Sequence, residues 1–188
     1  NLFRIGSSKR ILQSEQVLQG VPFLRISDLM QRIEGKQNTV TLFVSEAMFA
    51  QLQKDGLVPK SGDILITSRG TLGRCYVIQP EDRFYFQDGM ISWLSERNSA
   101  ITNTYLVYLF QMPRFRKQMA KILAGSTVAY LSIAMLKKIQ VPLPPLALQN
   151  EFAAFIEHLD KSKFSVSHQQ STIDSYQRGI ILQLAGGE

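Results

Sequence analysis

The chain has 188 residues, of which 45% are hydrophobic and 19% charged, a composition typical of a folded protein rather than a disordered one. Its single cysteine excludes an intramolecular disulfide framework and a zinc site built on several cysteines, and it fits a reducing compartment. No apolar run approaches the ~20 residues of a membrane helix, and the N-terminal residues lack the apolar core of a signal peptide. We therefore expect a cytoplasmic protein that does not enter a membrane.

The net charge of +6 is unevenly distributed along the chain. Residues 1–145 hold 18 Lys and Arg against 10 Asp and Glu, whereas residues 146–188 hold three against five. Within the first part, residues 97–145 include no acidic residue and seven basic ones: Arg97, Arg114, Arg116, Lys117, Lys121, Lys137 and Lys138. A segment that cannot neutralise its own field attracts a polyanion, and nucleic acid is the first candidate. Charge alone equally allows a solvated basic face that binds nothing.

The first hundred residues predict short strands separated by turns. Runs rich in apolar and β-branched residues predict strands at 21–26, 39–44, 63–67, 74–78 and 89–94. The glycine-spaced segment 68–73 lies between the third and fourth of these strands, so it predicts the turn of a hairpin. Ser45 predicts the N-cap of a helix whose Ala47, Met48 and Leu52 face inward.

After residue 100 the apolar residues fall at helical spacing. Leu106, Leu109 and Phe110 predict the buried face of a helix that Thr102 or Asn103 caps. This change from strand to helix patterns predicts an α+β fold, in which a mixed α/β domain precedes a long C-terminal helix.

A second predicted helix, residues 114–123, combines an apolar face with a basic one. Lys117 and Lys121 are i,i+4 neighbours on one side of this helix. The apolar face consists of Phe115, Met119 and Ile122. Ser132 then predicts the cap of a short helix over 133–138.

A proline cluster at 142–145 predicts the boundary between a globular domain, residues 1–145, and a long helix, residues 146–188. Within that helix one heptad position is always apolar, and a second is apolar only at its ends. These positions, the predicted helix-pairing interface, are Phe152, Ile156, Leu159, Val166, Ile173, Ile180 and Leu184. The pattern favours a coiled coil with a partner helix. The alternative is that the stripe packs on its own domain.

The sequence contains no recognised catalytic or metal-binding motif. Cys75 is expected to be a packed thiol, because it lies in the middle of a predicted strand. The segment 68–73 has the glycines of a phosphate-binding loop, but it joins two strands and lacks the following helix that would supply amide donors. We therefore predict that the chain is not an enzyme and holds no metal. A self-sufficient nuclease or methyltransferase is kept as an alternative.

Five segments in a fixed order resemble the specificity subunit of type I restriction-modification systems. They are residues 20–29, 62–74, 125–132, 136–145 and 149–152, the last leading to Leu159 and Asp160. The similarity extends over about residues 20–183. The resemblance implies that a target-recognition domain binds one half of a bipartite double-stranded DNA sequence, while the long helix acts as a spacer and docking element.

The resemblance also implies which other molecules take part. Modification subunits would bring S-adenosylmethionine and the methyltransferase site, and a restriction subunit, a motor nuclease, would bring ATP and Mg²⁺. The chain itself would need no cofactor. Because family members typically carry two domain-and-helix units, this chain is half-sized. It is either a fragment or a half-subunit that forms a homodimer, or pairs with a second half-subunit, through its helix.

The candidate DNA-binding residues come from the basic segments and the turns. Arg114, Arg116, Lys117 and Lys121 are expected at phosphates, and Arg69 and Arg74 at base edges. The complete set is Lys9, Arg10, Arg25, Arg69, Thr71, Arg74, Arg114, Arg116, Lys117, Lys121, Ser126, Thr127 and Tyr130. Lys9 and Arg10 are included because the resemblance implies basic residues near the domain start. The second hypothesis is a coiled-coil scaffold module whose basic face binds an acidic protein.

Overall fold

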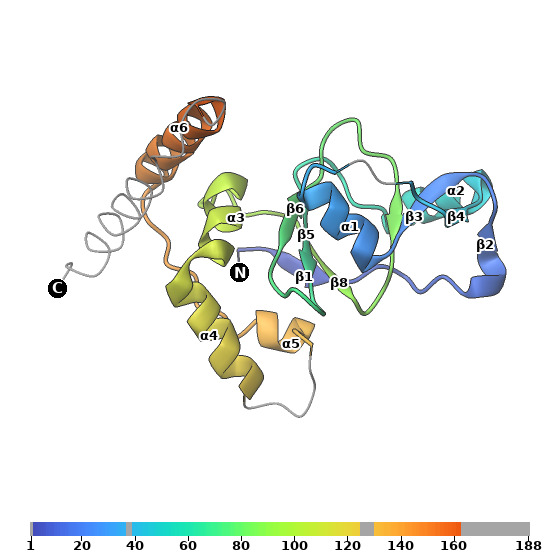
Figure 1. The fold of residues 1–188 in the computed structure, drawn as a ribbon, viewed down its shortest axis with the longest axis horizontal. Coiled ribbons are helices and arrows are strands. Elements are labelled where there is room, and N and C mark those ends of the chain that lie inside the picture. Colours follow the sequence, from blue (N-terminus) through green and yellow to red (C-terminus); the bar gives the residue numbers. More distant parts are fainter. Residues whose placement is uncertain (1, 37–38, 125–129, 163–188) are drawn as a thin grey trace.

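The structure is a computed structural model that describes residues 2–36, 39–124 and 130–162 (Figure 1). A central sheet of four antiparallel strands runs through the middle of the described part. Its strands, in spatial order, are β1 (Arg4–Gly6), β8 (Ile91–Ser95), β5 (Ile64–Thr67) and β6 (Cys75–Val77). Strands β5 and β6 form the predicted hairpin, in which Leu65 pairs with Tyr76.

A second sheet lies at one end of the molecule, beside α2 (Glu46–Lys54) (Figure 1). Its strands, in spatial order, are β2 (Gln16–Val17), β4 (Phe43–Val44), β3 (Val21–Leu24) and β7 (Tyr85–Phe86). A short 3₁₀ helix, η1 (Gln13–Glu15), precedes β2. Strand β3 is antiparallel to β4 and parallel to β7, so the second sheet is mixed.

The central sheet separates two apolar clusters because successive strand residues face opposite sides. On one face, Ile64 and Ile66 pack in a cluster with residues of α3 (Asn103–Gln111), α4 (Pro113–Ala124), α5 (Ile133–Leu136) and α6 (Leu146–Ser162). On the other face, Leu65 and Trp93 pack with Leu29 of α1 (Ile26–Ile33). The prediction of an α+β domain is confirmed.

The predicted helix caps are present. Ser45 Oγ accepts a hydrogen bond from Met48 N–H, and Ser132 Oγ accepts one from Met135 N–H, each 3.2 Å long. Thr102, rather than Asn103, caps α3. In each case a side-chain oxygen satisfies a backbone donor that the first helical turn leaves unpaired.

Some expected elements differ from those observed. In α2 the buried residues are Phe49 and Leu52, whereas Ala47 is exposed, so the predicted inward face is rotated. The strand expected over 39–44 is formed only by its last two residues. Sequence reasoning also missed five elements: α1, the 3₁₀ helix η1, and the strands β1, β2 and β7, which are only two or three residues long. None of the helices in the described ranges has the length and apolar character needed to cross a membrane.

Helix α6 (Leu146–Ser162) begins in the core of the domain that precedes it. Phe152, Ile156 and Leu159 are 3%, 4% and 7% exposed and belong to the same cluster as α3. The Phe152 ring meets Tyr105 and Tyr108 edge-on, with centroids 6.4 and 5.6 Å apart.

The assignment of these three residues to a helix-pairing interface is therefore wrong. The physical reason is that α3 supplies an aromatic surface within reach of the first turns of α6. The other predicted pairing residues, Val166, Ile173, Ile180 and Leu184, lie outside the described residues. The coiled coil and the boundary at residue 145 remain predictions.

Gln149 fixes the start of α6 to the start of α3. Its side chain is completely buried. Its Oε1 accepts a hydrogen bond from Thr102 N–H, and its Nε2 donates to the carbonyl oxygens of Ala100 and Pro144, each at 2.8 Å. One amide side chain thus satisfies three backbone groups, which sets where the helix leaves the domain.

Candidate nucleic-acid interface

The turn between β5 and β6, residues 68–74, is held in one conformation by its own hydrogen bonds. Gly70 and Gly73 have φ of +68° and +73°, values that favour glycine. Thr67 closes the turn at its base: its Oγ1 donates to the Thr71 carbonyl oxygen and accepts from Arg74 N–H at 3.0 Å. The tip, from Arg69 to Thr71, is exposed.

Neighbouring segments hold the same turn from two sides. Ser68 N–H donates to the Met90 carbonyl oxygen, and the Ser68 carbonyl oxygen accepts from Leu131 N–H, both at 2.8 Å. The second bond places Tyr130, which is 36% exposed, next to the turn. The turn is therefore a hydrogen-bonded, exposed platform that carries Arg69, and the backbone of the residue after Tyr130 is bonded to it.

Helix α4 also approaches the turn closely. A Cβ atom on Gly73 would lie only 3.0 Å from Cε of Met119, so glycine permits this approach. Phe115 and Met119 are buried, whereas the four predicted phosphate contacts on α4 are exposed. These are Arg114, Arg116, Lys117 and Lys121. At about 100° per residue, Arg114, Lys117 and Lys121 share one stripe and Arg116 lies on the other flank of the exposed face.

Ion pairing separates the candidate cations into two groups. Arg10 is bound to Asp88 at 3.0 Å and Arg25 to Asp28 at 3.4 Å. Within the described ranges, no carboxylate lies within 4.0 Å of the charged nitrogens of the other described candidates. These are Lys9, Arg69, Arg74, Arg114, Arg116, Lys117 and Lys121. Unpaired cations keep their charge and donors available for a ligand.

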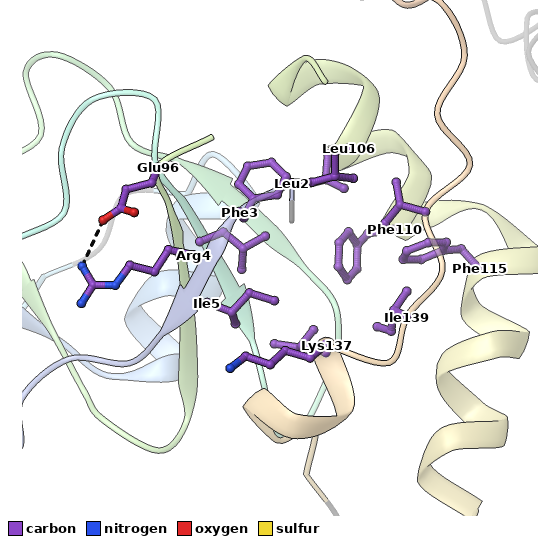
Figure 2. A pocket seen from close by; sticks show the side chains of 13 residues that line it. Leu2, Phe3, Arg4, Ile5, Glu96, Leu106, Phe110, Phe115, Lys137 and Ile139 are labelled. Carbon is purple, nitrogen blue, oxygen red and sulfur yellow. Dashed lines mark hydrogen bonds and ion pairs between the residues drawn. The ribbon is translucent and has the colours of Figure 1, made fainter. Parts of the chain in front are cut away.

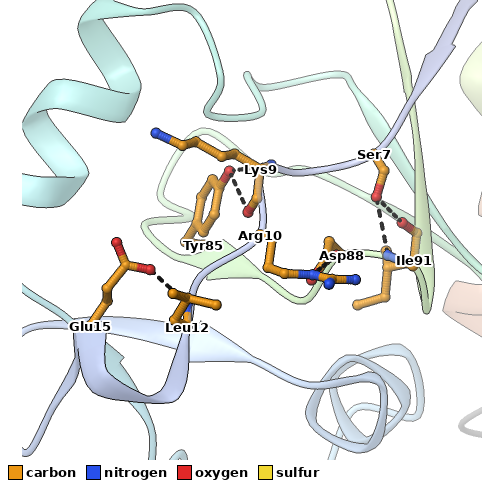
Figure 3. Close-up of polar contacts among 9 residues, drawn as sticks. Ser7, Lys9, Arg10, Leu12, Glu15, Tyr85, Asp88 and Ile91 are labelled. Atoms are coloured by element: carbon orange, nitrogen blue, oxygen red, sulfur yellow. Dashed lines mark hydrogen bonds and ion pairs between the residues drawn. The ribbon is translucent and has the colours of Figure 1, made fainter.

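Lys9 and Arg10 lie on a segment that is fixed to the residues before β8 (Figure 3). Lys9 N–H donates to the Tyr85 hydroxyl at 2.8 Å, and that hydroxyl donates back to the Lys9 carbonyl oxygen at 3.3 Å. Burial raises the pKa of Tyr85, so its hydroxyl stays protonated and able to donate. The backbone of this segment is held, while the Lys9 and Arg10 side chains remain exposed.

A shallow depression of about 350 Å³ lies between the turn and α1. Ile26 and Met30 of α1 and Met90 form its apolar part, and Arg69 and Thr71 contribute from the turn. Sequence reasoning missed the Ile26 and Met30 face because it predicted no helix at α1, and it missed Met90 because nothing in the sequence shows that the start of β8 lies beside α1. The start of α1 is hard to recognise in the sequence, because its N-cap is Arg25 and arginine is not a preferred N-cap residue.

A larger hollow of about 780 Å³ lies between β1 and helices α3 to α5 (Figure 2). Its apolar lining includes Phe3, Ile5, Leu106, Phe110 and Phe115. Its charged groups are Lys137 and the Arg4–Glu96 ion pair of 3.2 Å. A single ion pair and one lysine do not form a nucleophile-and-base arrangement, so the hollow offers no catalytic geometry.

The described residues offer little else for chemistry. No group of three or more His, Cys, Asp or Glu side chains in these ranges is placed to hold a metal ion. Cys75 packs against the core cluster, and burial raises the pKa of its thiol, which disfavours the nucleophilic thiolate. This agrees with the predicted packed thiol.

The structure brings together only part of the predicted site. Arg69, Thr71 and Tyr130 lie at the turn, α4 adjoins it, and Arg25 precedes the Ile26 that lines the depression. Arg74 is half-buried at the base of the turn, below the exposed tip. Ser126 and Thr127 lie outside the described residues.

Comparison with known proteins identifies the family. The profile described as "Type I restriction modification DNA specificity domain" matches residues 1–173. A Haemophilus influenzae protein named "Putative type I restriction enzyme specificity subunit" is 27% identical over 85% of this chain and 38% of its own length. The type I restriction enzyme MjaVIII specificity subunit of Methanocaldococcus jannaschii is 27% identical over 70% of this chain and 32% of its own length. The chain thus spans less than two fifths of these relatives.

Solved structures show the same fold. The HsdS subunit from Thermoanaerobacter tengcongensis aligns with a TM-score of 0.55 and 16% identity, over 98% of this chain and 43% of that one. A chain from work on complex assembly and conformational transition of the type I R-M system aligns with a TM-score of 0.60 and 17% identity, over 97% and 42%. The resemblance inferred from the five segments is confirmed. The chain belongs to the family of type I restriction modification DNA specificity domains.

Proposed function

We propose that this chain is a DNA-reading unit of a type I specificity subunit, which binds one half of a bipartite duplex target and performs no catalysis itself. Family membership supports a role in DNA specificity. The single observation that carries the proposal is the rigid turn at residues 68–74, which exposes an unpaired Arg69 beside Tyr130 and packs on the cationic helix α4.

The cations of α4 and Arg69 on the turn would have different roles in DNA binding. Contacts from α4 to phosphates fix the position of the domain on DNA and carry no sequence information. An arginine on a rigid turn can bond guanine O6 and N7 together, and the major groove admits a two-stranded β-ribbon such as β5–β6. Tyr130 would contact a sugar or base edge next to Arg69.

The partners belong to the same proposal. Modification subunits carrying S-adenosylmethionine and a restriction subunit using ATP and Mg²⁺ would dock on the full assembly, and this chain would hold no cofactor. A homodimer, or pairing with a second half-subunit, would supply the other half of the target. Since Phe152, Ile156 and Leu159 are buried in the core, pairing would depend on the residues that follow them.

The test is selection from a random duplex library. Purified chain is mixed with random-sequence DNA at moderate salt, and bound molecules are amplified and sequenced over several rounds. The proposal expects one short motif to be enriched by the wild-type chain and to change at one base position for Arg69→Ala. Recovery of no motif, or salt-sensitive binding to acidic protein but not to duplex DNA, would favour the scaffold hypothesis instead.

A further inference from the structure

On the basis of the proposed function, we propose that the depression beside Arg69 receives the C5-methyl group of a thymine in the DNA target. The depression combines an apolar floor with an exposed arginine at its rim. This combination is unusual for a phosphate-binding surface, because phosphates offer only charged oxygens. A base edge in the major groove can present both an apolar group and hydrogen-bond acceptors.

The floor comes from two segments that are distant in the sequence. Ile26 and Met30 lie on α1, and Met90 lies immediately before β8. Ile26 and Met90 also pack against the core cluster beneath the central sheet, so the floor is anchored. Met30 is half-buried and lies on the same helix.

The rim supplies the polar partner. Nη1 of Arg69 lies 3.9 Å from Sδ of Met90, a weak acceptor, and no other acceptor bonds this guanidinium within the described ranges. The Thr71 carbonyl oxygen is occupied by Thr67, which fixes the tip. The remaining guanidinium donors are therefore available to a base directly beside the apolar floor.

Among the standard bases, thymine alone carries an apolar group on its major-groove edge. The occupant that fits both the apolar floor and the arginine at the rim is thus a thymine. Its methyl group would contact Met30, Ile26 and Met90, and Arg69 would bond the neighbouring base. This assignment predicts that the target half-site contains a thymine next to the base whose identity depends on Arg69.

The experiment uses the duplex recovered by library selection. Each thymine is replaced in turn by deoxyuridine, which removes only the methyl group, and the dissociation constant is measured for the wild-type chain. We expect one position, next to the base sensitive to Arg69→Ala, to weaken binding about fourfold, the effect of one buried methyl group.

The same substitution is then measured with Met30→Gln, which keeps the side-chain length but removes its apolar character. Met30→Gln should bind the thymine and deoxyuridine duplexes equally, whereas Leu18→Gln, at a residue 92% exposed and away from the depression, should keep the fourfold difference. Thermal melting of both variants checks that they are folded.

The inference is overturned if no thymine position matters, if the difference persists in Met30→Gln, or if an abasic site at the same position binds as well as thymine. A failure of the selection itself would instead count against the proposed function, since the inference is tested only on a selected duplex.

Discussion

Helices α4 and α6 both carry apolar residues at helical spacing, but they differ in what surrounds the rest of the helix. In α4, Phe115 and Met119 are buried, while the opposite face exposes cations with no carboxylate near them in the described ranges. In α6, Phe152, Ile156 and Leu159 are buried against the chain's own α3. Periodicity therefore identifies which face of a helix is covered but not what covers it. We propose that the unpaired charge on α4 serves an external partner, whereas the apolar stripe at the start of α6 is covered by the chain itself.

The strongest test of this comparison is Phe152→Ala. If the start of α6 belongs to the domain core, truncating this ring should lower the free energy of unfolding by about 3–5 kcal/mol. Guanidinium denaturation measures the change, and Glu151→Ala, at an exposed neighbour, should stay within about 0.5 kcal/mol of wild type. An unchanged unfolding free energy together with abolished self-association would mean that this stripe pairs with another helix.

Gln149→Met tests the polar contact between α6 and α3, because it nearly keeps the volume of the side chain and removes its three hydrogen bonds. Leaving the Thr102 N–H and two carbonyl oxygens without partners should cost about 1–3 kcal/mol of unfolding free energy. Urea denaturation of Gln149→Met and of Asn150→Ala, an exposed neighbour, gives the difference. Equal stability of the two variants would show that the buried amide does not hold α6 on α3.

On the α4 side, the double variant Lys117→Ala/Lys121→Ala should weaken binding to every duplex. The slope of log affinity against log salt should become shallower by roughly 0.9 for each phosphate that the variant no longer neutralises. The charge-matched control is Lys54→Ala/Lys60→Ala, which removes two exposed cations elsewhere on the domain. Equal slopes for the two double variants would place the DNA face away from α4.

Sequence reasoning predicted the elements whose signals are local. The β5–β6 hairpin has β-branched strands around a glycine-spaced turn, and the helices after Ser45, Thr102 and Ser132 begin at side chains that cap them. Helix α1 was missed because its N-cap is Arg25, whose backbone N–H donates a hydrogen bond to the Asp28 carboxylate three residues later. The shortest strands have too few residues to show an alternating pattern.

Sequence reasoning selected the candidate residues from local features, namely charge composition, the glycine-spaced turn and the family resemblance. The acid-free segment identified the cations of α4, but no sequence pattern could show that Arg10 is neutralised by Asp88, which lies far along the chain. The bond from Leu131 to Ser68, which brings Tyr130 beside the turn, also depends on the folded chain. The stripe on α6 was assigned to the wrong partner for the same reason, since its neighbour α3 is adjacent only in space.

The most direct measurement is the ratio of dissociation constants for non-specific and selected duplexes, compared between Arg69→Ala and Lys117→Ala/Lys121→Ala. We predict that Arg69→Ala lowers the binding free-energy difference given by this ratio by about 1–3 kcal/mol, with little change in non-specific binding. The lysine variant should weaken both duplexes equally and leave the ratio unchanged. A ratio unaffected by Arg69→Ala would contradict the assignment of the 68–74 turn as the element that reads DNA.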